Sequence, residues 1–147
     1  MIATASTRVR DSSPDVVLRR AAVVFVVALV VHAADHLRRG FDVITPEVRW
    51  AGNAQLAMAT VAVVLVFARH RSAALWAIVV GFASAIGFAG AHVLPHWSAF
   101  SDSFTGSKVA PGVTWFSWFA ALFEIGADTL FGIAGLRVLR ARRMAAT

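Results

Sequence analysis

Two histidines and an aspartate lie at the end of the first long apolar run of this chain: His32, Asp35 and His36. Their spacing of i, i+3 and i+4 places all three side chains on one face of a helix. Two imidazoles one helical turn apart are able to bind a single metal ion. A carboxylate beside them serves as a third ligand or as the acceptor that orients a ring. The spacing therefore predicts a metal site at this helix end.

A second histidine pair, His92 and His96, has the same i, i+4 spacing at the end of the third apolar run. Pro95 lies between them, and a proline bends or ends a helix because it lacks a backbone N–H. We therefore expect His92 to be the better partner for the first histidine pair and His96 to fall in the loop, and we count both as candidate metal ligands. The remaining histidine, His70, lies between two arginines and is expected in a solvated loop.

Two acids, Glu124 and Asp128, share one helix face in the fourth apolar run. If this helix begins near residue 113, Glu124 lies about 16 Å along its axis, close to the middle of a membrane. An ionisable group at that depth costs about 2.5–3.5 kcal/mol and normally faces the protein interior or a wet cavity. Glu124 is therefore a candidate metal ligand or general base, and Asp128 a further intramembrane acid.

Imidazole and carboxylate ligands suit zinc, iron or copper rather than magnesium or calcium. With an open coordination position, zinc would support hydrolysis of a lipid-like substrate, and a carboxylate–histidine iron centre would support oxidation. One alternative is a membrane cytochrome, with haem held between His92 and either His32 or His36. Another is a proton-coupled carrier or an accessory subunit of a membrane complex, in which the polar residues form a relay or join helices together.

The composition indicates which solvent surrounds these residues. Apolar residues make up 59% of the 147-residue chain, charged residues only 15%, and the mean hydropathy is +0.71. A soluble domain of this size could not bury so much apolar surface in one core. The arginines gather at the ends of apolar segments, which is typical of membrane proteins, so the net charge of +6 indicates a lipid bilayer rather than nucleic acid as partner. The absence of cysteine excludes disulfides and thiolate sites.

The hydropathy pattern predicts an all-α fold, a four-helix transmembrane bundle in the cell membrane. We expect helices at about 14–39, 46–68, 73–94 and 113–139 because each segment has roughly the 20 apolar residues that a membrane span needs. Ser13-Pro14-Asp15 and Thr45-Pro46-Glu47 are helix start signals. The membrane domain then covers 13–140, with a disordered N-terminus at 1–12 and a basic tail at 141–147.

The distribution of basic residues predicts the topology. Ten lie in the N-terminal flank, the second connection and the C-terminal flank, and four lie in or beside the first and third connections. The positive-inside rule therefore predicts that both termini are cytoplasmic. The first and third helices then both run outward, which brings their histidines together near the outer face. A chain this short is also expected to form a homo-oligomer or to join a larger complex if it transports a solute.

Overall fold

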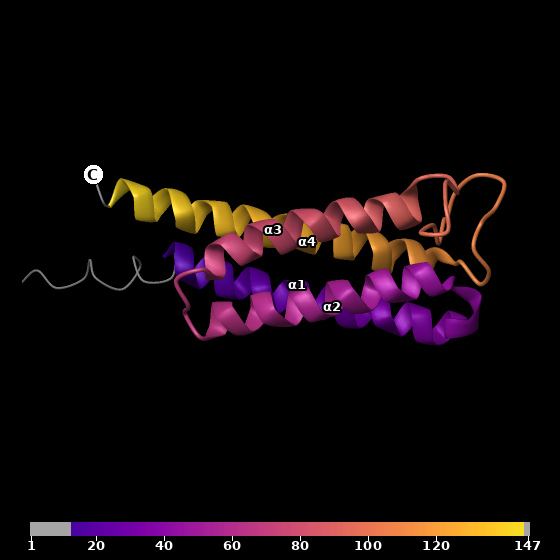
Figure 1. Ribbon diagram of the computed structural model, residues 1–147, viewed down its shortest axis with the longest axis horizontal. Helices are drawn as coiled ribbons and strands as arrows, with labels where there is room; N and C mark the ends of the chain where they lie inside the picture. The colour runs from indigo at the N-terminus through magenta and orange to yellow at the C-terminus, as the bar shows by residue number, and fades with distance from the viewer. Residues whose placement is uncertain (1–12, 146–147) are drawn as a thin grey trace, which may run out of the picture.

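The computed structural model describes residues 13–145, and within that range the regular secondary structure is all helical. The prediction of an all-α fold with four membrane-spanning segments is confirmed: four helices are long and apolar enough to cross a membrane, which indicates a multi-pass membrane protein (Figure 1). In chain order the elements are α1 (Pro14–Arg39), the 3₁₀ turn η2 (Phe41–Val43), α2 (Pro46–Phe67), α3 (Ala73–Phe88), the π-helical turn η3 (Ala89–Val93) and α4 (Trp115–Met144).

The start signals act as the sequence suggests. The Ser13 hydroxyl accepts a hydrogen bond from the Val16 N–H at 3.3 Å, which satisfies one of the free donors at the start of α1. Thr45 does the same for α2, with the Val48 N–H at 3.2 Å. α1 ends at Gly40, whose φ of 90° favours glycine over any residue with a side chain.

Successive helices run in opposite directions, so α1 and α3 are parallel (Figure 1). The last turn of α1, the first turn of α2, η3 and the start of α4 therefore lie at one end of the molecule, which we call the histidine end. The start of α1 and the end of α4 lie at the other end (Figure 1). Which end faces the cytoplasm stays a prediction from the arginine distribution.

α3 and α4 approach each other closely where glycines replace larger side chains. A Cβ added to Gly81 would lie 2.6 Å from the Asp128 carbonyl oxygen, and one added to Gly135 would lie 2.6 Å from the Ala74 carbonyl oxygen. Such contacts are the usual way in which small residues join helices in lipid. α1 packs on α4 through stacked Phe25 and Phe131 rings, whose centroids are 4.8 Å apart.

α2 packs against the other helices over only part of its length. Its buried residues are Ala59, Ala62 and Val66, all in its second half. The first half, at the histidine end, contains no buried residue. The space between this half of α2 and its neighbours is important for the site described below.

The structure also differs from the predicted boundaries. The α-helical part of the third span stops at Phe88 and continues as η3, because Pro95 prevents the helix from continuing and the Leu94 N–H bonds back to the Ala89 carbonyl at 3.2 Å. α4 extends to Met144, so most of the predicted basic tail at 141–147 is helical. The predicted disordered segment 1–12 and the last residues, 146–147, lie outside the described residues.

Candidate metal centre

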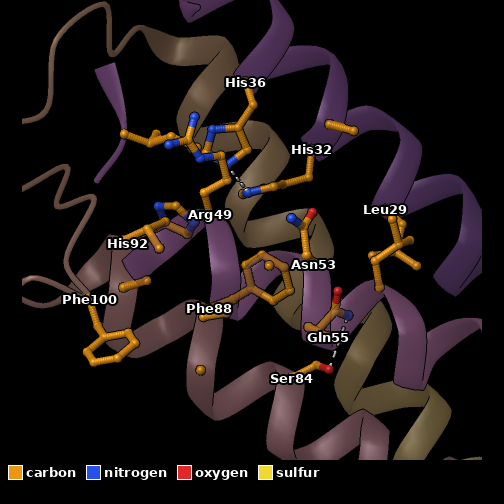
Figure 2. A pocket seen from close by; sticks show the side chains of 18 of the residues that line it. Leu29, His32, His36, Arg49, Asn53, Gln55, Ser84, Phe88, His92 and Phe100 are labelled. Atoms are coloured by element: carbon orange, nitrogen blue, oxygen red, sulfur yellow. Dashed lines mark hydrogen bonds between the residues drawn. The ribbon is translucent and has the colours of Figure 1, made fainter. Parts of the chain in front are cut away.

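Three of the predicted ligands lie together at the histidine end. One ring nitrogen from each of His32, His36 and His92 lies within 4.8 Å of the other two, and no other such group of three potential ligands occurs in residues 13–145. The His32 and His36 Nε2 atoms are 3.1 Å apart. The His32 and His92 ring centroids are 4.9 Å apart, and Figure 2 shows the three rings converging from α1 and η3.

The separation of these nitrogens is close to what one ion requires. Three points no more than 4.8 Å apart lie within about 2.8 Å of a common centre. Bonds from zinc to histidine nitrogen are about 2.0–2.1 Å long. Side-chain movements of less than about 1 Å would therefore bring all three nitrogens to bonding distance. His32 and His92 are buried and His36 is half-buried, so the group is reachable from one side.

The orientation of His92 is fixed by the loop that follows it. Its Nδ1 lies 3.1 Å from the main-chain carbonyl of Asp102 and 3.5 Å from the Asp102 carboxylate. An Nδ1–H donating to these oxygens leaves Nε2 free as the ligand atom, the arrangement that orients many metal-binding histidines. The loop is held there by two main-chain bonds, from Asp102 N–H to the Ala91 carbonyl and from Phe104 N–H to the His92 carbonyl.

Asp102 is the functional candidate that sequence reasoning missed. Its two carboxylate oxygens accept hydrogen bonds from the Arg39 guanidinium at 2.6 and 2.7 Å, and both side chains are almost completely buried. Arg39 also donates to the Pro111 carbonyl at 3.0 Å. The available signal was that Asp102 is the one acid in the connection between the third and fourth helices, in a stretch rich in serine. Arg39 therefore binds the loop that follows η3.

Asp35 lies on the histidine face of α1 as predicted, but the structure does not bring it into the group of three. Its Oδ1 accepts hydrogen bonds from Arg38 at 2.8 Å and from the Ser117 hydroxyl at 3.0 Å. Arg38 also donates to the Gly112 carbonyl at 2.8 Å. Asp35 thus joins α1 to the start of α4, because a buried carboxylate is most stable beside a cation and a hydroxyl donor.

The structure also leaves His96 outside the group of three. His96 is exposed and lines a smaller cavity of about 190 Å³ beside Lys108 and Ala110. Its side chain follows Pro95, where the chain has left the helix, so the i, i+4 spacing from His92 no longer places the two rings on one face. The predicted role of His96 as a ligand thus has no support from its position.

Glu124 and Asp128 are completely buried in α4, and their carboxylate oxygens accept no hydrogen bond within the described part of the chain. The Asp35–Ser117 and Phe25–Phe131 contacts set the register between α1 and α4. By interpolation, the backbone of Glu124 lies level with residue 30, about 3 Å deeper than His32 along the helix axis. The structure therefore places Glu124 near the depth of the histidines but not within their group.

A cavity of about 600 Å³ adjoins the three imidazoles. Its walls come from α1, α2 between Val48 and Met58, α3 and η3, and from the loop at Trp97 and Phe100 (Figure 2). The walls are mainly apolar, with the histidines at one end and the Gln55–Ser84 hydrogen bond of 3.2 Å farther along. Comparison of the chain with protein families, curated proteins and solved structures finds no significant match.

Proposed function

We propose that His32, His36 and His92 hold one transition-metal ion, of zinc, iron or copper. The observation that carries this proposal is that three imidazole nitrogens lie within 4.8 Å of one another. The Nε2 atoms of His32 and His36 face each other at 3.1 Å. Burying three imidazoles around one point costs free energy, and an ion bound to the facing nitrogens would offset part of that cost.

The proposed activity is metal-dependent chemistry on a lipid-like substrate. Three protein ligands leave a coordination position open, as in catalytic zinc sites, and the adjoining cavity gives a substrate access to that position. The ion would act there as a Lewis acid for hydrolysis if it is zinc, or in oxidation if it is iron or copper. Glu124 does not line this cavity, so its role as a general base stays a prediction from the sequence.

The contacts among the rings favour a bare ion over the two alternatives. His32 Nε2 contacts His36 Nε2, and Phe88 lies against the His32 ring with centroids 4.8 Å apart. A porphyrin between His32 and His92 would have to separate these groups, whereas a single ion would draw the three nitrogens together. A relay or a purely structural role does not require three imidazoles around one point.

Metal analysis of the purified full-length protein tests the proposal. We expect about one zinc, iron or copper per chain, lost or reduced at least tenfold in His32→Ala and His36→Ala. His70→Ala is the matched control, because His70 is an exposed histidine that bonds to Ser72 and lies far along the chain from the group. His96→Ala should also retain the metal.

The result that would refute the metal site is a wild-type protein that neither contains metal nor takes up zinc, iron or copper in titration. Helical content and thermal unfolding are measured for each variant. His36→Gln is a second variant at a half-buried position, which removes the imidazole while retaining a side chain of similar size. An absorbance spectrum of the same sample tests the haem alternative, which would give a strong Soret band.

A further inference from the structure

The cavity beside the histidines extends along the direction of the helices. Along α3 and η3 its wall runs from Val79 to His92, which corresponds to about 20 Å at 1.5 Å per residue. Along α2 it reaches Met58. The hydrocarbon core of a bilayer is about 30 Å thick, so one leaflet contributes about 15 Å and the cavity is long enough for one acyl chain.

The cavity lining carries positive charge and no negative charge. Arg49, on the first turn of α2, is the one charged side chain among the residues that line the cavity, and none of the seven acids within residues 13–145 is among them. Figure 2 shows Arg49 at the same end as His36 and His92, with Asn53 a turn farther along α2. An arginine, imidazoles and an amide next to apolar walls complement a ligand with an anionic head and an apolar chain.

We propose that this cavity binds a single-chain anionic amphiphile from the bilayer, of the class of long-chain carboxylates. The head lies at Arg49 and the histidines, and the chain extends toward Met58 and Val79. The placement of the head beside an ion rests on the proposed function, whereas binding of the chain in the cavity does not. This inference names the class of substrate on which the proposed metal centre would act.

The volume and the surroundings of the cavity support one chain drawn from lipid. About 600 Å³ is within the usual range for one small-molecule ligand and is enough for one acyl chain. The first half of α2 contributes no buried residue, so this wall of the cavity packs loosely against its neighbours. An amphiphile in the surrounding bilayer therefore has a route into the cavity that avoids water.

The test uses the full-length protein in nanodiscs of phosphatidylcholine and a palmitate that carries a photoreactive diazirine on its terminal carbon. We expect light to attach the probe to the deep end of the cavity, at peptides that contain Met58 or Val79, and unlabelled palmitate to compete. Gly87 lines the cavity and a Cβ there meets nothing within 4 Å, so Gly87→Leu fills the cavity without displacing its neighbours. We expect this variant to lose at least nine-tenths of the labelling.

Gly126→Leu is the matched control, because Gly126 is a helical glycine with equally open surroundings that does not line the cavity. It should label as the wild type does. If Gly87→Leu unfolds, Gly52→Leu fills the cavity from the opposite wall, where a Cβ also meets nothing within 4 Å.

The contact with the anionic head is tested separately. We expect Arg49→Gln to weaken palmitate binding about tenfold, as for loss of one charge-assisted hydrogen bond. Lys108→Gln, an exposed cation outside this cavity, should have no effect.

Neutral palmityl alcohol separates the role of the head from that of the chain, because its binding should not change in Arg49→Gln. Labelling spread over the lipid-facing surface, or labelling that persists in both filled-cavity variants, would overturn the inference. The metal content of each sample keeps the two proposals apart. Palmitate bound in the cavity of a protein that takes up no metal would refute the metal site alone, and metal bound without palmitate would refute this inference alone.

Discussion

The pair formed by Arg39 and Asp102 gives the sharpest quantitative expectation. The two groups are joined by hydrogen bonds of 2.6 and 2.7 Å, and their side chains are 0% and 2% exposed. Removing one partner of a buried pair leaves an uncompensated charge and typically costs about 3–5 kcal/mol. We therefore expect Asp102→Ala to lower the free energy of unfolding by about 3 kcal/mol, the lower end of that range, because the buried Arg39 guanidinium loses both of its carboxylate hydrogen bonds and keeps only the more distant Asp35 carboxylate, 3.9 Å away.

The same substitution should affect the metal centre less than it affects stability. Loss of a group that orients a metal-binding histidine typically lowers metal affinity about 10–100-fold. Here the main-chain carbonyl of Asp102, 3.1 Å from the His92 Nδ1, survives any side-chain substitution. We therefore expect the loss of affinity in Asp102→Ala to lie near the lower limit, about tenfold.

Unfolding is followed in detergent by tryptophan fluorescence, and metal affinity by equilibrium dialysis. The double variant Arg39→Met with Asp102→Leu should recover most of the lost stability, because two apolar groups replace a buried ion pair. Asp42→Ala is the control, because Asp42 is an exposed acid close to the same end. If Asp102→Ala unfolds at the same denaturant concentration as Asp42→Ala, the reasoning about the buried pair is wrong.

Four further outcomes are expected. Gly81→Ala should destabilise the protein by about 1–3 kcal/mol in thermal unfolding because its Cβ would meet backbone atoms of α4 at 2.6 and 2.7 Å, whereas Gly126→Ala should be neutral or stabilising. Metal retention in equilibrium dialysis should fall as the pH is lowered, since only a neutral imidazole binds a metal, and a pH-independent affinity would contradict histidine ligation. Glu124→Gln should keep its metal, because Glu124 lies outside the group of three; loss of the ion would make it a ligand. In this cysteine-free chain, single cysteines at Ser107 and His70 should react with an impermeant thiol reagent from opposite sides of the membrane, Ser107 from outside.

The sequence was sufficient to predict the elements and the meeting of the histidines. Apolar length identifies the spans, and alternating helix directions follow from their order, so the ends of α1 and α3 have to meet. The i, i+4 spacing then selects His32 and His36, and the position of His92 one residue before the end of η3 adds the third ring. These steps need only local periodicity and direction.

What the sequence did not predict depends on the path of an irregular loop. Asp102 is 63 residues from Arg39 and 10 from His92, and their contact depends on how the loop folds back on η3. No periodicity describes such a path. For the same reason, the sequence pattern placed Asp35 among the metal ligands, whereas its hydrogen-bond partners are Arg38 and Ser117. The cavity could not be predicted from the sequence either, because its existence depends on how loosely the first half of α2 packs.

The buried face of α1 shows how one helix supports both the fold and the site. Its buried residues follow a single stripe, which is apolar in its first part and polar in its last: Leu18, Ala22, Phe25, Ala28, His32, Asp35 and Arg39. The apolar part packs against α4, as the stacking of Phe25 on Phe131 shows, and this packing fixes the rotation of the whole helix. Because a helix is rigid over this length, the same contacts that stabilise α1 also direct His32, Asp35 and Arg39 inward at the histidine end. The free energy needed to bury these polar groups is thus offset within the helix that carries them, which explains how a small protein keeps a polar site inside a membrane domain.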